Sequence, residues 1–197
     1  MKRLEEALLA GLIISLIITI GADFSADCAA VRSQVLRLHI LAESDDPVDQ
    51  QNKLAVRDAL LAQSEGWFAA AQTVEQAVWT AEQRLERMES IARKTLEERG
   101  CSAGVRVELC EENFVTRIYE KGTLPAGRYH VLRVTIGEGK GKNWWCVMYP
   151  PLCLPAAAPP TDAQTAVEQL DSRTGYKMGF ALVELWETAR SKLQKAA

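Results

Sequence analysis

Two histidines and five cysteines are the side chains of this 197-residue chain that are best suited to nucleophilic catalysis or to zinc binding. A zinc site normally needs three or four Cys, His or carboxylate ligands at recognisable spacing. The chain has no C-x-x-C or H-E-x-x-H motif, and it also lacks the G-x-S-x-G motif of serine hydrolases. We therefore expect no metal, no cofactor and no catalytic residue.

Both histidines lie within strand-like patterns. Alternation over residues 35–41 places His39 beside Arg37, away from the apolar face, which predicts a solvated or edge histidine. His130 could still meet Cys146 in space and form a Cys–His pair. Nothing in the local sequence marks either residue as activated, so this pair is the less favoured alternative.

A glycine-rich stretch, Gly137-Glu-Gly-Lys-Gly-Lys142, could in principle cradle a phosphate with its backbone N–H groups. A Walker loop, however, requires Ser or Thr after its lysine and a helix after the loop. Here Asn143 and Trp144 follow Lys142 and continue into a strand pattern. The stretch therefore predicts a flexible hairpin with two exposed lysines, Lys140 and Lys142.

The cysteines permit a disulfide. Cys146 and Cys153 flank the sequence Pro150-Pro151, which must redirect the chain, so a bridge across this turn is sterically reasonable. An oxidising compartment would preserve it, with a stabilisation of at most about 2–3 kcal/mol for so short a loop. The alternative is two reduced, buried thiols.

The N-terminus predicts export. Met1-Lys2-Arg3 is a short basic start, and residues 7–20 form an uncharged, largely apolar run. This is the pattern of a secretory signal peptide, and at ~1.5 Å per residue the run spans about 21 Å, less than the ~30 Å hydrocarbon core of a bilayer. Residues 1–30 are therefore assigned as a signal peptide, with an uncleaved signal anchor as the alternative.

The overall charge is nearly balanced, with 23 basic and 26 acidic residues, which argues against a nucleic-acid-binding protein. Residues 1–30 carry two basic and four acidic side chains, so 21 basic and 22 acidic ones remain, for a net charge of −1. Long-range electrostatic steering is not expected to dominate the recognition of a partner.

Periodicity predicts an α+β fold, with an antiparallel sheet packed against two or three helices and preceded by the hydrophobic N-terminal helix. A helix is expected from Pro47 to about Ser64, and a second one, with a narrow apolar seam, from Thr73 to Gly100. That seam is expected to pack on the domain's own sheet or first helix, with a coiled coil as the alternative. The expected strands cover residues 35–41, 105–109, 114–119, 128–136 and 144–149, and the last four are joined as an antiparallel meander.

The expected domain organisation has four parts. Residues 1–30 form the signal peptide or anchor, and residues 31–153 form the core domain. Residues 154–174 form a Pro/Ala-rich linker and short helix, and residues 175–197 form a C-terminal strand and amphipathic helix.

Two stretches of the sequence resemble a known family. Residues 137–153, with Trp144-Trp145-Cys146 and Pro150-Pro151, resemble the hallmark segment of the stage II sporulation protein R family. Residues 35–50, followed by Lys53 and Arg57-Asp58-Ala59, resemble its other signature, and the resemblance covers about residues 32–154.

This resemblance implies a signalling protein and not an enzyme. Members are made in the forespore and exported into the space between the two membranes that surround it. There they activate a membrane-embedded aspartic protease of the mother cell, which cleaves the inactive precursor of sporulation sigma factor E. The resemblance supplies no catalytic residue, and membrane contact is expected through the N-terminal segment only.

Recognition of the protease is expected to involve the glycine-rich loop, with Lys140, Lys142, Asn143 and either Trp144 or Trp145. Adjacent strand residues point to opposite faces, so one tryptophan could be buried and the other exposed as an interface residue. The alternative is that both tryptophans are core and the loop is a plain hairpin. The alternative function is a secreted hydrolase with a Cys–His or carboxylate site, for which the candidate carboxylates are Glu108, Glu111, Glu112 and Glu120.

Overall fold

A computed structural model of the chain describes residues 2–119, 122–150 and 184. The C-terminal segments expected at 154–174 and 175–197 therefore lie outside the described residues, apart from Glu184. The elements are α1 (Lys2–Arg32), β1 (Leu36–Leu41), α2 (Pro47–Phe68), α3 (Val74–Glu82), α4 (Leu85–Glu97), β2 (Val105–Phe114), β3 (Arg117–Tyr119), β4 (Gly122–Leu124), β5 (Gly127–Ile136) and β6 (Asn143–Tyr149).

The α+β class is confirmed, but the sheet is mixed. Its strand order is β2-β5-β1-β6, and β3 and β4 form a separate two-stranded sheet. β1 lies between β5, which is parallel to it, and β6, which is antiparallel. The expected purely antiparallel sheet is therefore wrong. A meander pairs strands that are close in sequence, whereas β1 reaches its parallel neighbour through a long crossover that contains three helices.

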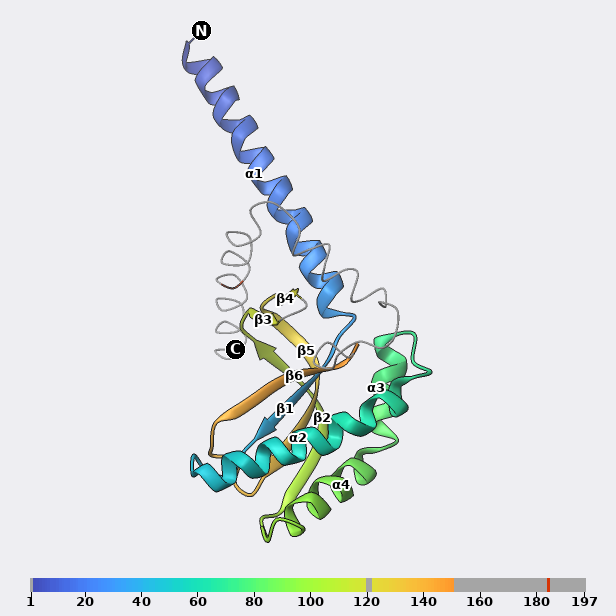
Figure 1. Cartoon of the computed structure of the whole chain (residues 1–197). Helices are drawn as coiled ribbons and strands as arrows, with labels where there is room; N and C mark the ends of the chain where they lie inside the picture. The colour runs from blue at the N-terminus through green and yellow to red at the C-terminus, as the bar shows by residue number, and fades with distance from the viewer. Residues whose placement is uncertain (1, 120–121, 151–183, 185–197) are drawn as a thin grey trace.

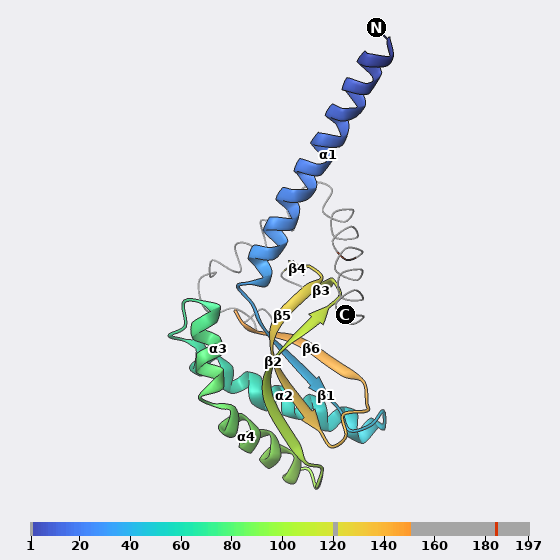
Figure 2. The same cartoon turned by 180° about the vertical axis from the view of Figure 1, so that it is seen from behind.

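Helices α2, α3 and α4 cover one face of this sheet, and α1 extends away from the domain (Figure 1, and from behind in Figure 2). α2 begins as expected, because the Val48 N–H donates to Asp46 Oδ1 at 2.8 Å and Pro47 occupies the first turn. It continues to Phe68, beyond the expected end at Ser64, and both of these side chains are buried.

The long helix expected from Thr73 to Gly100 is two helices. Thr73 caps α3, with Gln76 N–H donating to its hydroxyl at 3.4 Å, but the helix breaks at Gln83 and Arg84. Both short helices still bury the predicted seam: α3 contacts α2, β1 and β2, and α4 packs against α2 and β2. Packing within the domain is thus confirmed, and the break lets the seam follow a twisted sheet.

β2 is longer than expected. Residues 111–113, which lie between the strands expected at 105–109 and 114–119, continue the ladder with β5. Glu111 lies opposite His130 and Glu112 opposite Tyr129. The strands expected at 128–136 and 144–149 are confirmed as β5 and β6.

The sheet separates two hydrophobic cores. The main core lies between the sheet and the three helices and includes the inward side chains Leu38, Leu60 and Met88. The second core lies on the other face and brings Cys28 and Val31 of α1 against the sheet. The last turns of α1 are therefore part of the folded domain, although they fall largely within the segment expected to be a signal.

The second core also explains why one expectation fails. Arg37 is completely buried and His39 is 8% exposed, so the prediction of a solvated or edge histidine is wrong. Alternation placed both residues correctly on the face opposite the helices, but α1 and the β3–β4 hairpin cover that face.

Among the described residues, no helix combines the length and the apolar character required to cross a membrane.

The main core gives a direct test of the packing. We expect Met88→Ala to lower the free energy of unfolding by about 2–5 kcal/mol, because a fully buried side chain is replaced by a cavity. Val48→Ala is the control, since Val48 is 60% exposed on α2, and its effect should stay within about 0.5 kcal/mol. Urea unfolding of both variants measures the difference, and equal stabilities would contradict the assigned core.

Candidate functional site

The glycine-rich loop, residues 137–142, is fastened to the loop that follows β1, residues 42–46. Both loops lie at the same end of the sheet, because β1 and β5 are parallel and their C-terminal ends are side by side. The Gly141 N–H donates to Ala42 O at 2.9 Å and the Lys140 N–H to Glu43 O at 3.2 Å. The Lys142 N–H donates to Asp45 Oδ1 at 2.7 Å. These bonds order a loop that the sequence predicted to be flexible.

A buried lysine connects this pair of loops to α2. Lys53 is only 4% exposed, and its Nζ donates to Lys142 O at 2.8 Å and to Gln50 Oε1 at 2.6 Å. Burial lowers the pKa of Lys53, and the nearby Asp45 partly offsets that effect. Sequence reasoning missed this role, although Lys53 lies three residues before the buried Val56, on the same face of the helix.

Close approach of the two loops requires a glycine at position 141. A Cβ atom built there would lie 2.1 Å from the carbonyl oxygen of Ser44, which is far inside van der Waals contact. Any larger residue must push the two loops apart.

The fastened loop presents charged and polar side chains to solvent. Lys140, Lys142 and Asn143 are all exposed, and Lys140 Nζ forms an ion pair with Glu138 at the tip of the loop. The predicted exposure of both lysines is thus confirmed. The backbone that carries them is held at Lys140, Gly141 and Lys142.

The two tryptophans lie on opposite faces of β6, as expected, but each is only half-buried. Trp144 packs against the main core, and the Arg57 guanidinium carbon lies 4.4 Å from its ring centroid. Trp145 lies on the second-core side, stacked on His39 with centroids 5.6 Å apart and with the Arg117 guanidinium carbon 4.2 Å away. Each therefore has a partly accessible ring with an arginine against it.

The Cys–His pair of the alternative hydrolase site is not brought together. His130 on β5 lies opposite Leu36 of β1, and Cys146 on β6 lies opposite Leu38. Two strand spacings across the sheet and two residues along it separate their backbones by roughly 12 Å. Burial and the neighbouring Glu112 raise the pKa of Cys110 to about 11, so this thiol stays protonated at neutral pH.

The candidate carboxylates are used in ion pairs on the surface of the sheet. Glu108 and Glu112 both contact Arg133, at 2.8 and 3.1 Å, and Glu111 pairs with Arg128. Glu120 lies outside the described residues. Cys153 does too, so the predicted bridge to the buried Cys146 stays a prediction.

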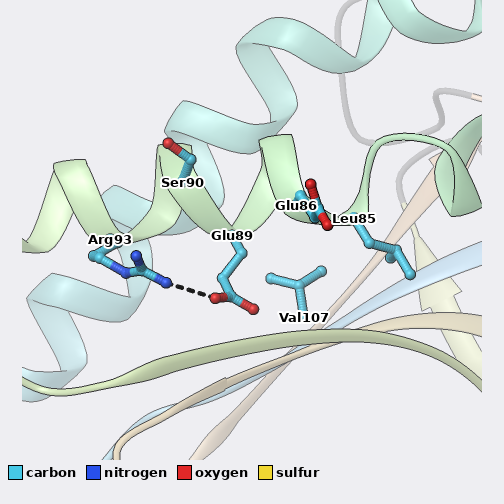
Figure 3. Close-up of a pocket in the computed structure, with 6 residues that line it drawn as sticks. All are labelled: Leu85, Glu86, Glu89, Ser90, Arg93 and Val107. Carbon is cyan, nitrogen blue, oxygen red and sulfur yellow. Dashed lines mark hydrogen bonds and ion pairs between the residues drawn. The ribbon is translucent and has the colours of Figure 1, made fainter.

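A shallow pocket of about 360 Å³ lies elsewhere, between α4 and β2 (Figure 3). Its acidic side chain Glu89 accepts a hydrogen bond from Arg93 at 2.6 Å. The lining residues are Leu85, Glu86, Glu89, Ser90, Arg93 and Val107, so none of the predicted site residues contributes to it.

The contact at Gly141 can be tested with a matched pair of substitutions. We expect Gly141→Ala to lower the free energy of unfolding by about 1–3 kcal/mol, because its methyl group overlaps the Ser44 carbonyl. Gly66→Ala is the control, because an added Cβ there meets nothing within 4 Å and the site is helical, so a gain of about 0.5–1 kcal/mol is expected. Urea unfolding measures both, and amide exchange at Lys142 should accelerate in G141A only. Unchanged stability of G141A would contradict the fastened loop.

Two comparisons with known proteins give the same family. The family model for stage II sporulation protein R matches residues 32–158, a range that contains both loops and Lys53. Stage II sporulation protein R of Bacillus subtilis (strain 168) is 37% identical over 123 residues, which cover 62% of this chain and 55% of that protein. The aligned part of the chain thus spans about half the length of this curated relative. No solved structure matches the chain. Because the family model covers well over half of its residues, the chain belongs to the stage II sporulation protein R family.

Proposed function

We propose that this protein is an exported sporulation signal that activates a membrane-embedded aspartic protease in the mother cell. The activated protease then cleaves the inactive precursor of sporulation sigma factor E. Membership of the stage II sporulation protein R family gives the chain its role in sporulation, and the proposal extends this role to a particular receptor and reaction.

The observation that carries the proposal is the direct attachment of the two signature segments to each other. Residues 42–46 and 137–142 come from distant parts of the sequence, yet four hydrogen bonds join the glycine-rich loop to the first loop and to Lys53. A loop that is ordered before binding loses less conformational entropy when it docks, so its contacts contribute more to affinity. Lys140, Lys142 and Asn143 are the side chains that it offers to the receptor.

An activator must also bind the active state of its receptor more tightly than the inactive one. Each tenfold shift in population requires about 1.4 kcal/mol of differential binding. Ion pairs of exposed lysines contribute about 0.2–1 kcal/mol each, so two that form only with the active state supply much of one tenfold shift.

The proposed location is the space between the two forespore membranes, reached by export through the N-terminal segment. Contact with the membrane is assigned to that segment, and the sheet and its loops face the receptor.

Coexpression tests the receptor interaction. The full chain is produced with the candidate protease and the sigma factor precursor, and precursor cleavage is followed over time. We expect cleavage to require the chain, and the double variant Lys140→Ala/Lys142→Ala to reduce its initial rate about tenfold, which corresponds to ~1.4 kcal/mol.

Lys94→Ala is the matched control for this experiment. Lys94 on α4 is as exposed as Lys140, at 76% and 75% of the side chain, and each lysine lies next to a glutamate. Normal cleavage with K94A and slow cleavage with the double variant supports the proposed docking loop. Cleavage without the chain contradicts the proposed function, and normal cleavage with the double variant contradicts the role of the loop.

The proposed export also predicts a bridge between Cys146 and Cys153. Intact protein secreted into an oxidising medium should be about 2 Da lighter than its reduced form, and a digest without reductant should contain one peptide pair that joins these two cysteines. A Cys146→Ser/Cys153→Ser variant should lose at most about 2–3 kcal/mol of stability. Recovery of both residues as thiols from the secreted protein would show that the bridge does not form.

A further inference from the structure

The face of the sheet opposite the three helices holds a buried arginine that has no carboxylate partner among the described residues. Arg37 is completely buried, and its Nη2 donates to the Tyr119 hydroxyl at 2.6 Å. Its Nε and Nη1 find no hydrogen-bond acceptor in the part of the chain that the structure describes. A buried guanidinium with unpaired N–H groups is costly, because desolvation removes the water that would otherwise accept from them.

Aromatic rings form the walls around this guanidinium. Its central carbon lies 3.8 Å from the centroid of Phe114, 4.9 Å from that of Tyr129 and 5.9 Å from that of Tyr119. These contacts offset part of the loss of hydration through cation–π attraction. They do not supply an acceptor for Nε and Nη1, which stay unpaired within the described part of the chain.

A second arginine lies beside the first. Arg117 of β3 also has a buried Nε without an acceptor among the described residues. Burial lowers the pKa of Arg37, and the positive charge of Arg117 lowers it further. His39, on the same strand as Arg37, has its Nδ1 2.7 Å from Glu112 Oε2, whereas its Nε2 is buried without a partner in that same part of the structure.

Other arginines of the chain show that this arrangement is unusual. Arg133, on the same face of the sheet, contacts both Glu108 and Glu112. Arg93 contacts Glu89 at 2.6 Å, and Arg57 contacts Asp58 at 2.7 Å. The chain supplies carboxylates to these exposed or half-exposed arginines and leaves the most buried one without any in the described residues.

We infer that Arg37 and Arg117 form a binding site for a carboxylate group, with the Tyr119 hydroxyl at its margin. Guanidinium groups match carboxylates in shape and charge, and such charge-assisted hydrogen bonds are strongest where water is excluded. The aromatic walls favour a compact, planar anion. Arg117 and Tyr119 belong to β3 of the separate two-stranded sheet, whereas Arg37 belongs to β1, so the proposed site lies between the two sheets.

Thermal unfolding of the full chain tests this inference independently of the proposed function. The midpoint is measured in sodium acetate and in sodium chloride at equal ionic strength and pH. A site that binds the folded state predicts a saturable rise in acetate, of about 3–6 °C at ten times the dissociation constant. Equal unfolding midpoints in acetate and in chloride would overturn the inference. That result would mean that acetate does not bind and that the N–H donors of Arg37 are satisfied by water in both salts.

Three substitutions assign the effect to the site. Arg37→Met and Arg117→Met should each abolish the difference between acetate and chloride, and R117M covers the case in which R37M does not fold. Arg133→Met is the matched control, because it removes a cation from the same face of the sheet. Arg133 already contacts two carboxylates of the chain, Glu108 and Glu112, so it is not expected to bind acetate and the acetate effect should persist. An acetate effect that survives in R117M, or one that disappears in R133M, would overturn the assignment.

Two further comparisons identify the source of the carboxylate. N-acetylglutamate amide, with N-acetylglutamine amide as its neutral control, mimics a side chain presented by a protein. Stabilisation by acetate and by the glutamate compound indicates a site that a partner's acidic residue can enter, and stabilisation by acetate alone indicates a small free carboxylate. Glu120→Gln removes the carboxylate that is nearest in sequence to Arg117 and Tyr119. An acetate effect that appears only in E120Q would mean that Glu120 occupies the site in the unmodified chain, and would overturn binding of an external ligand.

Discussion

The central position of β1 is the constraint on which the rest of the molecule depends. β1 is hydrogen-bonded to β5 on one side and to β6 on the other, so the sheet has no continuity without it. Its even-numbered residues, including Leu38 and Ile40, enter the main core, while Arg37 and His39 face the second core. The end of the same strand leads into residues 42–46, which hold the glycine-rich loop. One strand of six residues thereby determines both cores and the position of the candidate docking loop.

Local patterns predicted most of the elements, and non-local pairing explains most of the errors. The Asp46 and Thr73 caps, the apolar seam and the strands β5 and β6 follow from short-range chemistry that the sequence displays directly. The parallel pairing of β1 with β5 joins residues 94 positions apart, from Leu36↔His130 to Leu41↔Thr135, and no local signal specifies it. The break at Gln83 and Arg84 likewise has no glycine or proline to mark it, so no local signal predicts it.

The same distinction applies to the candidate site. The composition of residues 137–142 indicated exposed lysines, and these are exposed. What composition could not indicate is that the loop is ordered, because its partners are backbone carbonyls, a carboxylate and a buried amine from another part of the chain. Arg37 and His39 were placed on the polar face by alternation. Alternation distinguishes the two faces of a strand but does not say whether a second layer covers the polar one.

The last turns of α1 fix the orientation of this helix relative to the sheet. This helix is continuous from Lys2 to Arg32, about 46 Å at 1.5 Å per residue, and its last turns bury Cys28 and Val31 against the sheet. β1 follows four residues later and ends at the loops that carry the exposed lysines. The helix therefore lies at one end of the sheet, and the candidate docking loop lies at the opposite end. A partner that binds the N-terminal half of α1 would therefore lie at a fixed distance from Lys140 and Lys142. The same contact would fix the direction in which the two lysines face relative to that partner.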